Sequence, residues 1–508
     1  MTRRILFTAA VGMMFYCATL PSLALPNFRT AAEARSWAEH AERTGNYADA
    51  AAAYQYESTI RRRTGDPQGA EVELRKAQRL KTDIVFAVQS TPGDSANDSP
   101  DSSPSRFGRP EREAHNPNSG QTEERAGVGS AKWEPDSGCY IGVRDDFEGQ
   151  YYGRDTANSE NFAQRVDHPV AVALDYDDYG RPFPVQWAER EHQHGRAIQI
   201  AWEPKNIYAV QDDDYLNNWA EAAAQSGAPI FLRFGGEMNG EWTSWGRNPA
   251  AYRRAFRTVA KVMRRRASNV AMVWAPNSIP TTNLDSYYPG DDVVDWVGIS
   301  LYIVRFYDDN LSRPAFRDSV ESLIDPFYQK YARRKPLCLA ECGITRRSRV
   351  EESDADGFAA DRIVDLMEAI KIRYPRLKMA TFFDRNNLRT AESGRRLNDY
   401  SLPPGSLALT ALRKELEDPY FLGHVRRRST APVSYTPTSS VPAGYHGDVF
   451  VSLSTYSVEP YLQVRRGDTV LKVARPFEFA IPDGDGPLQI TVYDDKGRIA
   501  KKAQLNTQ

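Results

Sequence analysis

The chain has 508 residues, which is too long for one compact core and predicts two to four domains. Its formal net charge of −2 and its isoelectric point near 6.4 give no general reason to expect a nucleic-acid partner. Aromatic residues make up 11% of the chain, a content that fits a carbohydrate binder and equally a protein with large cores.

The amino terminus has the pattern of a secretory signal peptide. Arg3 and Arg4 precede an apolar run over residues 5–20, and residues 22–24 offer a small-x-small cleavage site. The run is shorter than the roughly 20 residues of a spanning helix; an uncleaved anchor is the alternative. We therefore expect residues 1–24 to be removed, and the mature protein to be secreted or periplasmic with no membrane span.

Residues 28–90 are predicted to form a helical segment. Residues 31–43, 47–63 and 68–84 are rich in Ala, Glu, Arg and Lys and are separated by glycine-containing breaks. The turn at residues 45–47 before an alanine-rich helix resembles a tetratricopeptide hairpin, which would dock a protein partner. A small helical bundle that packs on its neighbour is the alternative. Residues 91–135 are predicted to be a disordered linker, because Pro, Ser, Asp and Asn dominate and large apolar residues are scarce.

Residues 136–420 alternate short apolar runs with polar helical segments, which predicts parallel β/α units. The eight apolar runs are 139–143, 170–174, 197–202, 230–234, 270–275, 294–301, 337–340 and 379–383. The clearest helical segments are 215–225, 252–266, 316–332 and 357–373. Eight repeats predict a (β/α)8 TIM barrel. A doubly wound open sheet is the alternative, and the lack of a Gly-rich phosphate loop after the first run argues against it.

Residues 435–508 switch to short strand candidates separated by Gly-Asp turns, which predicts a small all-β domain of the sandwich type. Tyr456, Tyr461 and Tyr493 fit either a sugar-stacking surface or ordinary packing, and packing is the favoured interpretation. Three cysteines follow the signal peptide, namely Cys139, Cys338 and Cys342. Their odd number leaves an unpaired thiol, and buried thiols are favoured over a disulfide. The seven histidines show no metal-ligand spacing, so we expect neither a metal nor a cofactor.

Two glutamates follow apolar runs of the predicted barrel. Glu237 comes after the fourth run, close to Trp242 and Trp245, and Glu341 ends the seventh. Active sites of such barrels lie at the carboxyl ends of the strands. Glycoside hydrolysis needs a protonated acid and a second carboxylate at the anomeric carbon. The two glutamates therefore predict acid–base chemistry on a sugar.

Several motifs in chain order resemble glycoside hydrolase family 26, the β-mannanase family. Residues 233–242, R-F-x-x-E-M-N-G-x-W, are similar to its acid/base loop, and residues 340–343, A-E-C-G, to its nucleophile strand. Supporting matches are Trp202-Glu-Pro204, Trp274-Ala-Pro-Asn277, Tyr288-Pro-Gly-Asp291, Val294-Asp-Trp-Val-Gly298 and Tyr302. The resemblance covers residues 139–384. It implies a retaining mechanism with Glu237 as acid/base and Glu341 as nucleophile.

The same resemblance indicates the substrate-binding residues. They are expected to be Arg233, Asn239, Trp242, Trp245, Trp202, Tyr302, Asn277 and Asp384. Three positions depart from the family: Gly236 replaces a usual His, Ser300 replaces a frequent Asp, and Phe382-Phe383-Asp384 stands where a Trp often floors the site. Each departure touches sugar contacts, and both glutamates are retained. We therefore expect conserved chemistry on an altered glycan.

These observations predict a secreted retaining endo-β-glycosidase that hydrolyses a β-mannan-like or other β-linked polysaccharide. The alternative is a non-catalytic glycan-binding barrel in an envelope or exopolysaccharide assembly, with the helical and β modules docking partners. Retention of Glu237 and Glu341 favours the enzyme.

Overall fold

The computed structural model describes residues 28–44, 47–91, 131–146, 159–351, 354–426, 428–442 and 445–507. The predicted signal peptide, residues 1–24, and most of the predicted linker lie outside the described residues. The chain divides into two compact units, residues 1–82 and 83–508. In the part of the chain that the structure describes, no helix is long and apolar enough to cross a membrane.

The first unit contains three helices, α1 (Ala31–Arg43), α2 (Tyr47–Arg63) and α3 (Pro67–Leu80). The side chain of Thr30 caps α1 by accepting from the Glu33 amide, and that of Asp66 caps α3 by accepting from the Gly69 amide. Alanines fill most of the small core. The helical prediction is thus confirmed for residues 31–43 and 47–63.

The prediction of helix up to residue 84, and of a helical segment up to residue 90, is wrong. The third helix ends at Leu80, and residues 83–90 form strand β1 (Asp83–Ser90). The sequence Asp-Ile-Val-Phe-Ala-Val-Gln-Ser is rich in β-branched and aromatic residues, which favour strands. Its pairing partners, β13 and β15, lie more than 340 residues further along the chain, so no local pattern indicates them.

The predicted eight-stranded barrel is confirmed. Its strands are β2 (Cys139–Asp145), β3 (Val172–Asp178), β4 (Ala197–Glu203), β5 (Ile230–Phe234), β6 (Val270–Trp274), β7 (Trp296–Ile303), β8 (Leu337–Ile344) and β10 (Leu377–Asp384). All neighbours are parallel, and β10 pairs with β2 to close the barrel. The rings of Phe231 and Trp296, from the non-adjacent strands β5 and β7, lie 5.2 Å apart inside it. The interior is therefore filled by side chains, as in other barrels of this size.

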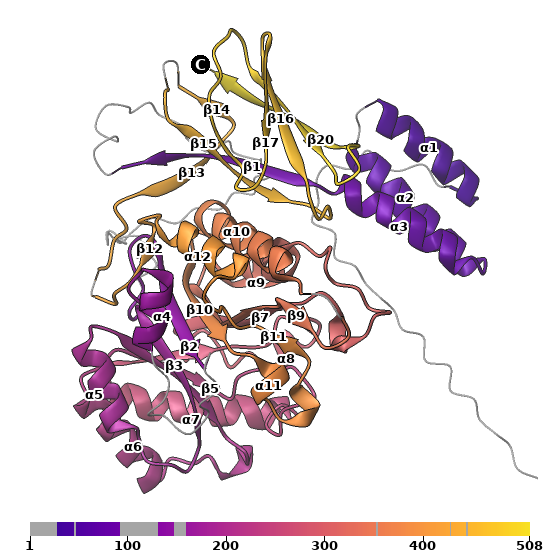
Figure 1. The fold of residues 1–508 in the computed structure, drawn as a ribbon. Helices are drawn as coiled ribbons and strands as arrows, with labels where there is room; N and C mark the ends of the chain where they lie inside the picture. Colours follow the sequence, from indigo (N-terminus) through magenta and orange to yellow (C-terminus); the bar gives the residue numbers. More distant parts are fainter. Residues whose placement is uncertain are drawn as a thin grey trace, which may run out of the picture. The chain divides into compact units, whose positions relative to one another are not determined.

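Helices and short segments of strand connect the barrel strands (Figure 1). The helices are α4 (Ser159–Val166), α5 (Val185–Gln193), α6 (Asp214–Gln225), α7 (Pro249–Arg266), α8 (Leu284–Tyr287), α9 (Val320–Tyr331), α10 (Asp356–Ile372), α11 (Asn387–Thr390) and α12 (Leu407–Leu416). The short strands are β9 (Arg347–Ser348), β11 (Asn398–Asp399) and β12 (Phe421–Leu422). Apolar side chains that point outward from the strands pack under the helices and form the largest core.

The last residues of the predicted linker are ordered. The Lys132 ammonium donates to the Val270 carbonyl, and the Trp133 indole donates to the Asn269 carbonyl. The Trp296 indole donates in turn to the Lys132 carbonyl. These bonds lie at the amino-terminal ends of β6 and β7, opposite the predicted active face. The barrel domain therefore begins by residue 131, earlier than the predicted residue 136.

Two sheets form the carboxyl-terminal sandwich. One has the order β13-β1-β15-β18 and the other β14-β20-β19-β16-β17. Their strands are β13 (Ser434–Thr438), β14 (Ser440–Val441), β15 (Asp448–Ser454), β16 (Tyr461–Arg466), β17 (Thr469–Val473), β18 (Glu478–Ala480), β19 (Leu488–Tyr493) and β20 (Ile499–Thr507). Phe86 and Val451 of the first sheet and Val464 and Val492 of the second share one buried core. The domain is thus completed by a strand that precedes the barrel in sequence, as the indigo strand among yellow ones shows (Figure 1).

The sandwich is held to the barrel through the end of α10. Arg373 donates to Asp83 of β1 and to the side chain and carbonyl of Ser452 of β15. Lys371 lies 3.1 Å from the carboxylate of Asp418, which also accepts from the Tyr435 hydroxyl. Because several of these charges are buried, removing one partner would leave an uncompensated charge. The contact therefore depends on charged groups from both domains.

Two deletions test the role of β1. Deleting residues 1–90 removes a central strand, which leaves β13 without a partner, β15 paired only with β18, and the sandwich core without Phe86, whose truncation alone would cost about 3–5 kcal/mol. We expect a large fall in the thermal unfolding temperature and rapid proteolysis of the sandwich. Deleting residues 1–82 keeps β1 and serves as the control. Equal stability of the two variants would contradict the composite sandwich.

Candidate active site

The fold brings Glu237 and Glu341 to the same face of the barrel. Glu237 lies in the loop that follows the fourth barrel strand, β5, and Glu341 lies within the seventh, β8. Arg233, on β5, donates a hydrogen bond to Oε2 of Glu341 and forms an ion pair with Oε1 of Glu237 at 3.9 Å. One guanidinium therefore contacts both carboxylates.

A bulge in β8 aims Glu341 into the barrel. Ile299 of β7 pairs with Leu339, but the next residue, Ser300, pairs with Glu341, so Ala340 is an extra residue in the ladder. Leu339 belongs to the outward-facing core, whereas Ala340 belongs to the interior cluster. If the strand were regular at Ala340, strict alternation would turn Glu341 outward with Leu339. The carbonyl of Ala340 accepts a 2.5 Å hydrogen bond from the buried side chain of Gln199.

Three donors surround the carboxylate of Glu341. They are the Arg233 guanidinium, the Tyr302 hydroxyl and the Tyr176 hydroxyl, the last at 2.6 Å. Burial opposes the charged form, but Arg233 and the two tyrosine hydrogen bonds outweigh it and lower the pKa of Glu341. Burial beside this carboxylate raises the pKa of both Tyr176 and Tyr302. Glu341 is thus held as an anion, and both tyrosines are held as donors.

Glu237 has a different environment. Its backbone has φ of 58°, a left-handed conformation that is rare for a residue with a side chain, and its amide donates to the Ala275 carbonyl. Its carboxylate accepts hydrogen bonds from the side-chain amide of Asn277 at 3.1 Å and from the Trp242 indole at 2.7 Å. The Glu237 side chain is 20% exposed against 7% for Glu341, and Trp242 is 51% exposed. Of the two carboxylates, Glu237 is the one open to solvent.

The space beside Gly236 is occupied by Arg233. A Cβ atom at position 236 would lie 2.6 Å from Nε and 2.9 Å from Cζ of Arg233. The Arg233 guanidinium also donates to the Ser300 hydroxyl at 2.6 Å. Two departures from the family pattern, Gly236 and Ser300, therefore contact the same buried guanidinium. A histidine at position 236 is incompatible with this position of Arg233.

Two predicted substrate-binding residues, Asn239 and Trp245, are largely buried and hold the loops of the site through hydrogen bonds. Asn239 is buried. Its side chain donates to the backbone carbonyls of Asn277 and Pro280 and accepts from the backbone amide of Asn277. Trp245 is 8% exposed, and its indole donates to the Gly236 carbonyl at 2.8 Å. These bonds fix the loops that carry Asn277 and Glu237.

Two other predictions of substrate contact are wrong. Trp202 is fully buried and stacks on Trp219 with ring centroids 4.2 Å apart, in the core between strands and helices. Asp384 is also fully buried; it accepts from Arg165 and from the Leu402 amide. Burial and the neighbouring Asp145 raise the pKa of Asp384 to about 7, against the effect of Arg165. Trp202 follows the outward alternation of β4, and Asp384 is enclosed by the segment around Leu402.

Sequence reasoning missed several residues at the site. Tyr176 lies in the polar end of β3, Asp-Tyr-Asp-Asp, which was the one signal in the sequence for it. Phe383 and Tyr400 surround Tyr302, with ring centroids 5.9 and 4.9 Å from its ring. Glu203 was not missed, since it belongs to the motif at residues 202–204; it ends β4, and burial raises its pKa against the effect of Arg233. No motif indicated Tyr400, because it lies in an irregular loop far along the chain from Tyr302.

The cysteines and the sandwich tyrosines do not add a second site. Cys139, Cys338 and Cys342 are free, buried thiols, and burial raises the pKa of Cys342. Among the described residues, no group of His, Cys, Asp and Glu has the arrangement of a metal site. In the sandwich, Tyr461 stacks on Tyr493 at 4.8 Å and carries the Lys472 ammonium 4.2 Å from its ring centroid. Both rings are thus engaged in packing, the interpretation that the sequence favoured.

Parts of the chain are similar to known proteins. The chain is similar to a β-1,3-xylanase of a Vibrio species, 33% identical over 110 residues, which are 21% of this chain and 24% of that protein. It is 27% identical over 217 residues to endoglucanase H of Acetivibrio thermocellus, covering 39% of this chain and 23% of that protein. The chain thus spans about a quarter of the length of these curated relatives.

A solved structure, a modular endo-β-1,4-mannanase from Cellulomonas fimi, is 17% identical, covers 74% of this chain and 99% of its own, and has a TM-score of 0.40. The model of the family described as glycosyl hydrolase family 26 matches residues 203–325. This stretch runs from the end of β4 into α9 and includes Glu237 and its loop. Over these residues the barrel of this chain is similar to glycosyl hydrolase family 26.

Proposed function

We propose that this protein is an endo-β-glycosidase that hydrolyses a β-linked polysaccharide by a retaining double displacement. One observation carries the proposal: the buried Arg233 contacts both Glu237 and Glu341, which differ in exposure and in hydrogen-bond donors. Retaining glycosidases need a carboxylate nucleophile and a nearby acid that alternate in role. The arrangement offers one anionic, shielded carboxylate and one that solvent reaches.

In this mechanism Glu341 attacks the anomeric carbon and Glu237 protonates the leaving oxygen. The donors Tyr176, Tyr302 and Arg233 keep Glu341 ionised and fix its orientation before attack. In the second step Glu237 accepts a proton from the water that releases the sugar from Glu341. Trp242, half exposed and hydrogen-bonded to Glu237, offers a ring for the sugar face.

The glycan is a β-mannan-like or another β-linked polysaccharide. The relatives are named for xylan, glucan and mannan; a further one is a mannan endo-1,4-β-mannosidase of Caldalkalibacillus mannanilyticus, 27% identical over 174 residues. Arg233 fills the space where the family usually has a histidine, which supports a changed sugar contact. The pattern of residues 3–24 supports a secreted or periplasmic location, and a protein partner for the helical unit stays a prediction.

Substitution of each glutamate tests the roles. Glu237→Gln and Glu341→Gln should each lower kcat on the best β-glycan by about 10²–10⁴-fold, because each removes a group that acts in the transition state. Reducing sugar released from mannan, xylan and glucan panels is the measurement. Glu241→Gln, an exposed glutamate in the same loop, is the matched control and should retain activity.

The outcomes separate the enzyme from a glycan-binding barrel. Full activity of Glu341→Gln would exclude it as the nucleophile. Binding of a β-glycan by the native protein, without release of sugar from any polymer, would instead support the non-catalytic alternative.

The fall of kcat/KM at low pH, the acid limb of the pH profile, is expected to report the protonation of Glu341. Activity needs its carboxylate ionised, so kcat/KM falls as the pH drops through its lowered pKa. Tyr176→Phe removes a 2.6 Å hydrogen bond to the anion, raises the pKa of Glu341 and should move this limb to higher pH by about one unit. Tyr374→Phe, which removes a 2.8 Å bond to Asp325 on the outer helices, is the control and should not move it. An unchanged limb in Tyr176→Phe would contradict the assignment.

Gly236→Ala tests whether Arg233 needs the empty position. The new Cβ would lie 2.6 Å from Arg233 Nε, so the guanidinium must move away from the carboxylates. Displacing such a group by about 1 Å can cost 10²-fold in rate, and we expect at least about a tenfold loss of kcat/KM. Gly357→Ala, where no atom lies within 4 Å of the new Cβ, is the control. Native activity of Gly236→Ala would show that the position of Arg233 is not required.

A further inference from the structure

We propose that the mouth of the barrel carries a cationic rim, formed by Arg347, Arg389 and Arg395, that binds a negatively charged substituent of the glycan. The substrate would then be an acidic β-linked polysaccharide, with carboxylate or ester sulfate groups on its sugars. This inference rests on the proposed function and names the chemical class of its substrate.

The rim lies on two loops. One follows β8, the strand that carries Glu341, and the other follows β10, which pairs with β8. The segment after β8 forms β9, the segment after β10 forms β11, and the two pair antiparallel, with Asp399 opposite Arg347. Arg389 lies on α11, and Arg395 lies in a short 3-10 helix, Ser393–Arg395, between α11 and β11. Both loops extend from the carboxyl ends of barrel strands, where the two glutamates lie.

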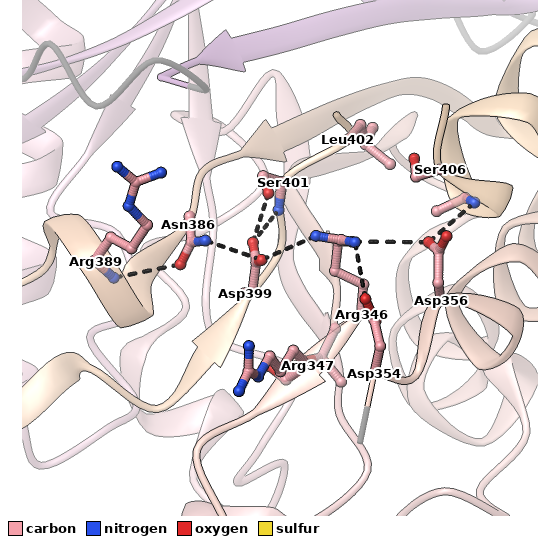
Figure 2. Close-up of polar contacts among 12 residues, drawn as sticks. Arg346, Arg347, Asp354, Asp356, Asn386, Arg389, Asp399, Ser401, Leu402 and Ser406 are labelled. Carbon is pink, nitrogen blue, oxygen red and sulfur yellow. Dashed lines mark hydrogen bonds and ion pairs between the residues drawn. The ribbon is translucent and has the colours of Figure 1, made fainter. Parts of the chain in front are cut away.

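A polar network holds these loops together (Figure 2). Arg346 forms ion pairs with Asp354, Asp356 and Asp399, and Asp399 also accepts from the side chain of Asn386 at 2.9 Å. The Asn386 side chain accepts from the backbone amide of Arg389 at 3.3 Å. The network thus uses Arg346 and the backbone near Arg389 and leaves the Arg347 and Arg389 guanidinium groups outside it, as Figure 2 shows.

The rim arginines have no acidic hydrogen-bond or ion-pair partner among the residues that the structure describes, and all three are exposed. Other arginines of the same loops are paired: Arg349 with Asp309, and Arg385 with Asp146. Glu392 is the exposed acid on the segment that carries Arg389 and Arg395. Arg396, exposed in the same segment, donates to the Ala391 carbonyl and pairs with no acid among the described residues. The rim arginines likewise keep their charge available.

An aromatic contact connects the segment that carries the rim to the candidate active site. Tyr400, directly after β11, packs against Tyr302, which donates to Glu341. Burial raises the pKa of Glu203, at the end of the third barrel strand, and the positive charge of Arg395 offsets a small part of this rise. Phe383, at the end of the eighth strand, and Tyr400 both pack against Tyr302, so the segment that carries Arg395 begins and ends beside the residue that donates to Glu341. A glycan bound at Glu341 would therefore pass beside the rim.

Arginine suits a charged substituent better than a neutral sugar. Its planar guanidinium binds carboxylate or sulfate oxygens through two parallel hydrogen bonds. Hydroxyl groups of a neutral polysaccharide would gain little from three unpaired charges. The same charges attract an anionic polymer over a Debye length of about 8 Å at physiological salt, so the rim would also raise the rate of encounter.

The test compares matched polymers with one backbone. A uronate-bearing β-glycan is assayed against its carboxyl-reduced form, and a sulfated β-glycan against its desulfated form. We expect the native protein to have about tenfold higher kcat/KM on one acidic polymer than on its neutral form, and this ratio to fall as salt increases. Whichever pair shows the preference identifies the charged group.

The triple variant Arg347→Gln, Arg389→Gln, Arg395→Gln should bring the ratio close to one. Arg254→Gln, an exposed arginine on α7, is the control and should keep it. Hydrolysis of neutral and acidic polymers at equal kcat/KM by the native protein would overturn the rim proposal and leave the proposed function standing. If no polymer is hydrolysed, the proposed function fails, and binding of the same polymers, measured by calorimetry, then tests the rim proposal. Tighter binding of acidic than of neutral polymers by the native protein, lost in the triple variant, would support the rim proposal. Equal binding of acidic and neutral polymers would overturn it.

Discussion

The buried guanidinium of Arg233 is the constraint on which the candidate site depends. It lies between Glu341, Glu237 and Ser300, and a buried charge of this kind is tolerated only when opposite charges compensate it. Its presence explains the glycine at position 236 and the lowered pKa of Glu341. The Arg233 side chain thus keeps Glu341 ionised and contacts Glu237, so the same group affects both the stability of the buried site and its chemistry.

The irregularity of β8 serves the same arrangement. One extra residue at Ala340 reverses the alternation of the strand and turns Glu341 to the inside. The Ala340 carbonyl, displaced from the ladder, accepts a hydrogen bond from the Gln199 side chain and so keeps a partner. The left-handed backbone of Glu237 is the matching irregularity on the other side. Each of the two carboxylates thus lies at a local departure from regular geometry.

The domains are less separate than their order in the chain indicates. Strand β1 precedes the barrel in sequence yet lies in the centre of a sandwich sheet, and Arg373 at the end of α10 binds both β1 and β15. Through this shared sheet and its charged contacts, the sandwich is a fixed neighbour of the barrel's helical shell. The first unit ends at residue 82, and the chain continues directly into β1 of the sandwich.

The sequence by itself determined the periodic features: eight apolar runs within a few residues of the observed strands, the sandwich strands, and Glu237 and Glu341 at the active face. These follow from local patterns, because burial on both faces of a parallel strand requires an apolar run. The tertiary structure decided which way side chains point and what meets across long distances. It placed Trp202 and Asp384 in the interior, joined β1 to strands more than 340 residues away, and brought Tyr176 and Tyr400 to the site. Such contacts depend on register, bulges and loop paths, which leave no periodic trace in the sequence.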